Sequence, residues 1–277
     1  MQSRTVGGVS VLALRDARGP FESWTEQFPD ATDRQWATAR AADPAAFGDD
    51  DLWWIDFRAF AIRTASGVVL VDTGIGPVDA PASSWAPVPG RLPTALADAG
   101  VAVTDVRTVV LTHLHSDHTG WAVGADGVPT FPNARYVVQR AETRWLDREF
   151  ADGKVHAWAL RPLRAAGALD EVDGETLLVA DRSGGSVTAF PTPGHTPGHQ
   201  SVVVRGDGPD VLVTGDVLVH TLQLMAPSVT YAHEVDPEQA RDTRRALLDR
   251  AADTGAVLAT SHLTAPFVTV PARTSTG

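Results

Sequence analysis

The segment His113-Leu114-His115-Ser116-Asp117-His118 places four potential metal ligands within six residues. Its spacing suits two adjacent cations, because His113 and His115 can face one metal while Asp117 and His118 turn toward a second. Imidazole and carboxylate together suit zinc and similar divalent ions. Two such ions about 3.5–4 Å apart can share a hydroxide that attacks an electrophilic carbon or phosphorus. The pattern therefore predicts a dinuclear hydrolytic centre.

Three further segments repeat one arrangement, in which a potential ligand follows an apolar run. His195 lies in a Pro- and Gly-rich turn, which holds an imidazole at little entropic cost. Asp216 follows the apolar run 211–213, and His262 follows the run 255–260. A single histidine at a strand end is usually structural. Four such sites in one chain, one of them carrying four potential ligands, favour a metal centre instead.

The elements that position these residues follow from hydrophobic patterning. The run 106–112 reads as a buried strand that delivers the histidine-rich segment, and 68–71 as a strand that ends at Asp72. Further strands are predicted at 9–14, 54–63, 134–138, 176–179, 187–190, 201–204, 211–213 and 255–260. Helices are predicted at 34–42, 140–148, 157–166 and 237–252. Strands and helices mix in both halves, which predicts two sheets with helices outside.

The composition of the chain limits which partners and which cellular compartment we expect. The net charge of −11 argues against nucleic acid or an anionic membrane as a partner. The absence of cysteine excludes disulfides, thiolate metal sites and a catalytic thiol. No signal peptide is evident, and no stretch approaches the roughly 20 apolar residues of a membrane helix. We expect a cytoplasmic, soluble protein.

Taken in order, these motifs resemble the metallo-β-lactamase superfamily. The resemblance implies an α/β fold, the four-layer αββα sandwich, with residues 1–277 forming one domain and 15–51 an insertion near the active-site rim. It also implies a ligand set. By resemblance, the first metal takes His113, His115 and His195, the second takes Asp117, His118 and His262, Asp216 bridges both, and Asp72 orients ligands without binding metal.

Subfamily features narrow the resemblance further. The zinc β-lactamases use a cysteine ligand or lack the bridging carboxylate, and the members that cleave nucleic acids carry additional domains or an exosite. The intervals His118–His195 and Asp216–His262 are similar to those of acyl-homoserine-lactone lactonases and phosphotriester hydrolases. In that branch a tyrosine often contacts the substrate carbonyl, and Tyr231 is the candidate here. His220 is a second candidate for the pocket wall.

The expected activity is hydrolysis of a small lactone or carboxylic ester with an apolar portion, with Asp117 carrying the proton to the leaving group. Two zinc ions are expected, although manganese, iron or cobalt would accept the same ligands. The alternatives are a phosphotriester hydrolase, a biosynthetic thioesterase or cyclase, and a persulfide dioxygenase with one iron. A homodimer is possible. We expect His199 and Tyr136 to be structural, and His156 and His233 to be solvated.

Overall fold

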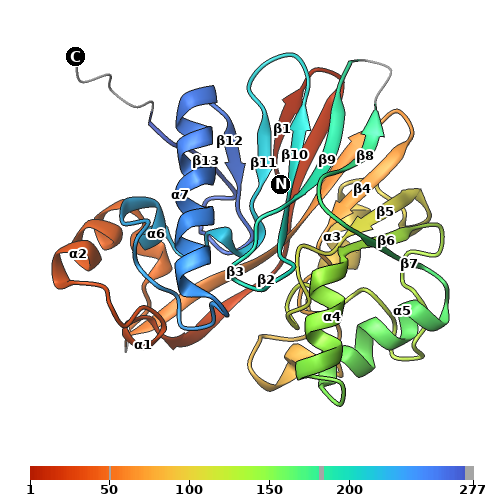
Figure 1. The fold of residues 1–277 in the computed structure, drawn as a ribbon, viewed down its shortest axis with the longest axis horizontal. Coiled ribbons are helices and arrows are strands. Elements are labelled where there is room, and N and C mark those ends of the chain that lie inside the picture. The colour runs from red at the N-terminus through yellow and green to blue at the C-terminus, as the bar shows by residue number, and fades with distance from the viewer. Residues whose placement is uncertain (50, 181–183, 272–277) are drawn as a thin grey trace.

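The computed structural model describes residues 1–49, 51–180 and 184–271. Two β-sheets pack face to face, and helices cover the outer face of each (Figure 1). The strand order is β1-β2-β3-β4-β5-β6-β7 in the first sheet and β13-β12-β11-β10-β9-β8 in the second. Each half of the chain therefore builds one sheet, which confirms the predicted αββα sandwich.

The first sheet changes from antiparallel to parallel pairing at β4. Its antiparallel part contains β1 (Gln2–Val6), β2 (Val9–Ser23), β3 (Leu52–Thr64) and β4 (Gly67–Val71). Its parallel part continues through β5 (Val106–Val110), β6 (Arg135–Gln139) and β7 (Leu169–Val172). Because β4 and β5 are parallel neighbours, the loops that follow them leave the sheet at the same edge.

The second sheet consists mainly of antiparallel pairs, with one parallel pair, β11 and β12. Its strands are β8 (Thr176–Ala180), β9 (Ser186–Pro191), β10 (Gln200–Arg205), β11 (Val211–Val213), β12 (Val257–Ala259) and β13 (Phe267–Thr269). Strands β9, β11 and β12 all point the same way, so their carboxyl ends meet at one edge.

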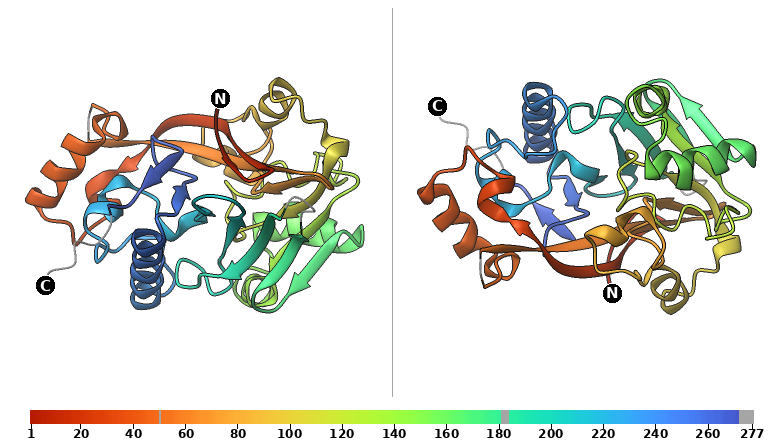
Figure 2. Two further views of the ribbon diagram at one scale, coloured as in Figure 1. Left: turned by 90° about the horizontal axis from the view of Figure 1, so that it is seen from above. Right: turned by 90° about the horizontal axis from the view of Figure 1, so that it is seen from below.

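The helices fall into three groups. On the first sheet lie α3 (Leu92–Asp98), α4 (Arg140–Glu149), the π-helical turn η4 (His156–Leu160) and α5 (Arg161–Ala165). On the second sheet lies α7 (Pro237–Thr254). At one end of the sandwich, beside α7, gather α1 (Trp24–Gln27), α2 (Asp33–Ala42) and α6 (Thr221–Met225) (Figures 1 and 2). Short 3-10 turns are η1 (Pro44–Ala46), η2 (Pro81–Ser84), η3 (Val103–Asp105) and η5 (Gly215–Val217).

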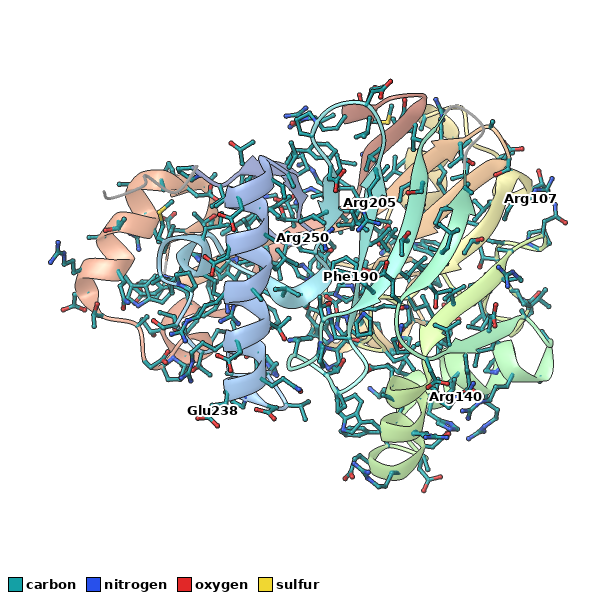
Figure 3. All side chains as sticks on the ribbon, turned by 45° about the horizontal axis from the view of Figure 1, so that its top comes forward. Arg107, Arg140, Phe190, Arg205, Glu238 and Arg250 are labelled. Carbon is teal, nitrogen blue, oxygen red and sulfur yellow. The ribbon has the colours of Figure 1, made fainter. Side chains whose placement is uncertain are left out.

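Alternation along β3 shows how the layers are built. Phe60 and Ile62 face the second sheet, whereas Ala59 and Ala61 face the helices on the other side. Both faces are buried, so the strand reads as a continuous apolar run rather than an alternating one. On the opposite surface, Arg250 of α7 lies over the ring of Phe190 at the end of β9, 5.3 Å from its centroid (Figure 3).

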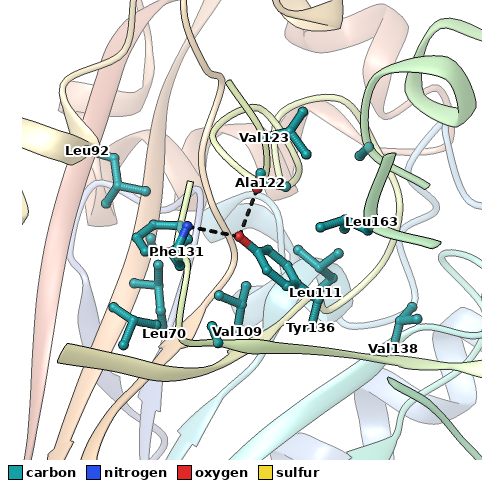
Figure 4. Close-up of a cluster of buried hydrophobic side chains, with 14 of the residues drawn as sticks. Leu70, Leu92, Val109, Leu111, Ala122, Val123, Phe131, Tyr136, Val138 and Leu163 are labelled. Carbon is teal, nitrogen blue, oxygen red and sulfur yellow. Dashed lines mark hydrogen bonds between the residues drawn. The ribbon is translucent and has the colours of Figure 1, made fainter. Parts of the chain in front are cut away.

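Tyr136 belongs to the core, as expected. Its ring lies among aliphatic side chains under the helices of the first sheet (Figure 4). Its hydroxyl donates to the Ala122 carbonyl at 2.8 Å and accepts from the Phe131 N–H at 3.2 Å. Because both hydrogen-bonding roles are used within the protein, this tyrosine is not available to a ligand.

Two boundaries differ from those expected. Strand β2 continues to Ser23, because residues 15–23 pair with the first half of β3, so the segment outside the sheets begins only at residue 24. The segment 217–235, for which no helix was predicted, contains α6. Strands β1, β7 and β13 were not anticipated, because each is a short edge or near-edge strand of three to five residues. Within the described residues, no helix is long and apolar enough to cross a membrane.

Candidate metal centre

Seven side chains from both sheets converge at the shared edge of the sandwich. They form two groups of candidate donors, and within each group the donor atoms lie within 4.8 Å of one another. The first group is His113, His115, His195 and Asp216, and the second is Asp117, His118 and His262. These are the residues that the resemblance implied; Asp216, implied as a bridge, falls in the first group.

Asp216 joins the two groups. Its Oδ2 lies 3.4 Å from His195 Nε2 and 3.8 Å from His113 Nε2. Its Oδ1 lies 3.3 Å from His118 Nε2 and 3.1 Å from His262 Nε2. One carboxylate thus presents one oxygen to each group, which is the arrangement of a bridging ligand. The backbone N–H of Asp216 donates to His199 Nε2 at 2.9 Å, so His199 has the structural role expected of it.

Two hydrogen bonds determine which ring nitrogens face the centre in the second group. His118 Nδ1 lies 2.8 Å from Asp72 Oδ2, and His262 Nδ1 lies 2.8 Å from the Asp56 carbonyl. Both oxygens can only accept, so each Nδ1 carries the proton and each neutral ring has its Nε2 lone pair free. These two lone pairs face one another at 3.2 Å. Such a pair has no hydrogen bond to make when neutral and needs a cation, so the residues fit a metal ion.

The first group shows the same demand for positive charge. His115 Nδ1 and His195 Nε2 face one another at 3.0 Å, and the Nε2 of buried His113 has no hydrogen-bond partner among the residues that the structure describes. His113 Nδ1 lies 3.0 Å from the Thr112 hydroxyl, which fixes its ring. A buried nitrogen without a partner is costly unless a ligand occupies its lone pair.

Electrostatics keeps the histidines of the first group and the two carboxylates in the forms that bind metal. Burial lowers the pKa of His113 and His195 well below the usual value and the pKa of His115 to about 4, so their rings are neutral. Burial favours the neutral acid for Asp216 and Asp117, yet the neighbouring histidines hold the pKa of each carboxyl below its usual value. The first group therefore offers neutral imidazoles, and the two carboxylates of the centre are ionised.

Asp72 organises the loop beneath the second group. Its Oδ1 accepts from the Thr112 N–H at 2.8 Å, and its Oδ2 accepts from the Thr112 hydroxyl at 2.9 Å as well as facing His118. It reaches this position with a positive φ of 62°, a conformation that few residues other than glycine adopt. Asp72 thus touches a candidate ligand from behind, as expected.

A cavity of about 440 Å³ opens onto the centre. His115, Asp117, Asp216 and His262 form its polar end. Its walls include apolar side chains from both halves of the chain, namely Phe21, Ile55, Pro81, Trp85, Leu114, Trp145, Leu146, Phe150 and Val155. A mostly apolar pocket that ends in a few convergent polar groups is typical of small-molecule sites.

Tyr231 lies in this cavity and His220 does not. The Tyr231 ring stacks on His195 with 6.0 Å between centroids and 8° between planes. His220 instead caps α6, accepting the Leu222 N–H at 3.0 Å, and packs among aromatic rings that include Trp53. The expectation that His220 lines the pocket was therefore wrong, because its ring completes an aromatic core. His156 and His233 also line the cavity. His233 is exposed, as expected, whereas His156 is half-buried and its Nε2 lies 3.0 Å from Asp147 Oδ1.

Glu142 on α4 was not anticipated, although it fastens the two ligand-bearing loops together. Its carboxylate accepts from the Leu114 N–H at 2.9 Å and from the Gly198 N–H at 3.0 Å. Burial raises the pKa of Glu142 to about 7, with both N–H donors acting in the opposite direction. Its position in a helix facing two distant loops is a tertiary feature, and the sequence carries no local motif for it.

Arg58 on β3 plays a corresponding role for His262. Its guanidinium donates to the carbonyls of Thr260, Leu263 and Thr264, which surround the histidine, and pairs with Asp56 at 3.1 Å. Burial lowers the pKa of Arg58 to about 10, a value at which it remains charged at neutral pH. The sequence signal here is a charged residue within an apolar strand, which indicates a buried charge but not the carbonyls that it contacts.

The fold and the two donor groups together define a candidate metal centre at the open edge of an αββα sandwich. The metallo-beta-lactamase superfamily model matches residues 58–262, and the chain belongs to this superfamily. It is 36% identical over 172 residues to the N-acyl homoserine lactonase AttM of Azorhizobium caulinodans, covering 59% of this chain and 60% of that protein. It is 31% identical to a probable metallo-hydrolase of Mycobacterium tuberculosis, covering 57% and 56%. The matched part thus spans about 60% of the length of these relatives.

Solved structures support the same fold. The hydrolase AbOPH of the beta lactamase superfamily superposes with a TM-score of 0.79 at 26% identity, covering 99% of this chain and 97% of that one. The dizinc quorum-quenching lactonase AidC, solved with a product, superposes with a TM-score of 0.80 at 21% identity, covering 100% and 95%.

Proposed function

We propose that this protein is a metal-dependent hydrolase that opens a lactone or cleaves a carboxylic ester, with two zinc ions held by the seven residues of the centre. The observation that carries the proposal is Asp216, whose two oxygens face two separate groups of donors. The names of the lactonase relatives and the apolar walls of the cavity favour a lactone with an apolar substituent.

When bound, a pair of divalent ions lowers the pKa of water toward neutrality and polarises a substrate carbonyl. The protein supplies the other parts of the reaction. Asp117 is ionised and faces the cavity, so it can accept a proton from the attacking water and return it to the leaving alkoxide. Water is the nucleophile, and no acyl-enzyme is formed.

Tyr231 has a complementary role. Burial and the nearby carboxylates raise the pKa of its hydroxyl well above the usual value, so the O–H stays protonated. A protonated hydroxyl beside the centre can donate a hydrogen bond to the carbonyl oxygen as it gains negative charge. We propose that the Tyr231 hydroxyl contacts the substrate and that the His195 ring supports the Tyr231 ring.

The test combines metal analysis of protein purified without chelator with turnover of a lactone, an aryl ester, a thioester and a phosphotriester. We expect about two zinc ions per chain and preferential lactone or ester turnover. Asp216→Asn should remove metal and lower turnover at least about a hundredfold, since even residues behind the ligands commonly contribute ten- to a hundredfold. Asp210→Asn, at the start of β11 and paired with Arg205, is the matched control.

Each other outcome identifies a different enzyme. Turnover of the phosphotriester alone would show that the enzyme acts at phosphorus rather than at a carbonyl carbon. One iron per chain without ester turnover would contradict the proposal and favour the persulfide dioxygenase class. Two zinc ions with turnover of thioesters only would favour a thioesterase.

A further inference from the structure

Residues 217–234 connect two parts of the candidate site. This segment begins directly after Asp216, passes through α6, and carries Tyr231 back to the cavity. At its far end the Val235 N–H donates to the His195 carbonyl at 3.0 Å. The place of the Tyr231 hydroxyl over the centre therefore depends on what fastens this segment to the rest of the fold.

One buried arginine fastens it at several points. Arg244 of α7 is 1% exposed, and its Nε donates to the Val217 carbonyl at 2.9 Å. Its Nη1 donates to the carbonyls of Pro227 at 3.0 Å and Val229 at 3.1 Å, and its Nη2 pairs with Glu234. The planar guanidinium thus holds the start, middle and end of the segment at once, from a single position on the helix.

Glu234 connects this arginine to the tyrosine. While one of its oxygens pairs with Arg244, the other accepts the backbone N–H of Tyr231 at 3.2 Å. The backbone adds a further link between the two residues, since the Glu234 N–H donates to the Tyr231 carbonyl at 3.0 Å. Both charged side chains are 1% exposed, so water cannot solvate the charge of one if the other moves away.

From these contacts, we propose that Arg244 is a positioning residue that acts through Glu234 to hold Tyr231 against His195 at the mouth of the metal site. The inference rests on the proposed function in one respect, which is the contact between Tyr231 and substrate. Lysine cannot replace this arginine, because a point charge on a flexible stem cannot donate to Val217 and Glu234 in two fixed directions.

The first test is a double-mutant cycle on lactone turnover by the zinc-loaded enzyme. We expect Arg244→Lys to lower kcat/KM about tenfold in the wild-type background and less than about twofold in Tyr231→Phe, because interacting residues are not additive. Arg245→Lys is the matched control on the same helix, since Arg245 is half-exposed and pairs only with Asp242 among the described contacts. Losses from Arg244→Lys that are equal in the two backgrounds would overturn the proposal.

A second test needs neither substrate nor metal. The chain has two tyrosines, so fluorotyrosine labelling yields two fluorine resonances, and Tyr231→Phe assigns them. In metal-free protein we expect Arg244→Lys and the milder Glu234→Gln to shift or broaden the Tyr231 resonance while the Tyr136 resonance stays in place. An unchanged Tyr231 resonance in both variants would overturn the proposal.

The two tests separate the two proposals. If wild-type enzyme turns over none of the substrates, the proposed function fails, while the fluorine spectra still decide the role of Arg244. A shift of both resonances would show general loss of structure rather than positioning, and would count against the inference.

Discussion

Each histidine of the second metal group is oriented by the hydrogen bond that its Nδ1 makes. Asp72 and the Asp56 carbonyl take the Nδ1 protons of His118 and His262, and this leaves the Nε2 lone pairs to face the centre. In metal-free protein, burial opposes protonation, but the surrounding carboxylates raise the pKa of His118 well above its usual value. The site therefore holds a proton where it would otherwise hold a metal ion.

His220 gives a residue-scale prediction, because burial alone lowers its pKa to about 3. Below about pH 6.5, His220 binds a proton in the unfolded chain but stays neutral in the folded protein. The free energy of unfolding therefore decreases as the pH falls. His220→Asn keeps an acceptor for the Leu222 N–H and removes the titration. Relative to the wild type, the variant should gain about 2 kcal/mol between pH 7 and pH 5, from 1.36 kcal/mol per pH unit. Urea unfolding of metal-free protein at both values measures this, and parallel changes in the two proteins would contradict it.

At the scale of elements, the sequence predicted most strands and all longer helices because their apolar patterns are local. The seven candidate ligands were predictable because each follows an apolar run that ends at the same sheet edge. Glu142, Arg58 and Arg244 were not, because each acts on backbone groups far away in the chain. A burial pattern identifies a core position, but not the distant carbonyl or N–H that a charged side chain will meet there.

Helix α4 and the turn that carries His195 make contact too closely for any side chain at Gly198. A Cβ there would lie 2.1 Å from the Glu142 nitrogen and 2.5 Å from its Cα. Gly198→Ala should force the two elements apart, costing about 1–3 kcal/mol of stability and about tenfold or more in zinc affinity, as for other residues that orient ligands. Unfolding and chelator competition measure the two effects.

Gly174→Ala is the control for that variant. Gly174 has a φ of 77°, and no atom of the described residues lies within 4 Å of an added Cβ, so alanine there brings backbone strain without a clash. It should cost about 1–2 kcal/mol and leave zinc affinity unchanged. Equal zinc affinities in the two variants would show that the contact between α4 and the turn does not position the ligands.

At the scale of the whole molecule, metal should act as part of the fold. Donors from both sheets meet at the centre, so zinc bound there opposes separation of the sheets. Free zinc at a hundred times its Kd adds about 2.7 kcal/mol, which in a chain of this size raises the Tm by roughly 5 °C or more. Calorimetry with increasing zinc measures this. Magnesium, which prefers oxygen ligands, should have little effect, and equal responses to both ions would contradict a nitrogen-rich centre.

The division of the sheets along the chain has a consequence for how the molecule can be assembled. The first sheet uses residues 2–172 and the second uses 176–269, with only a short connection between them. A cut in that connection would leave each fragment with one whole sheet, and would place His113 and His118 on one fragment and His195 and His262 on the other. Association of two such fragments would bury their apolar faces again and complete the donor set, so zinc should strengthen it and could control it in a split protein.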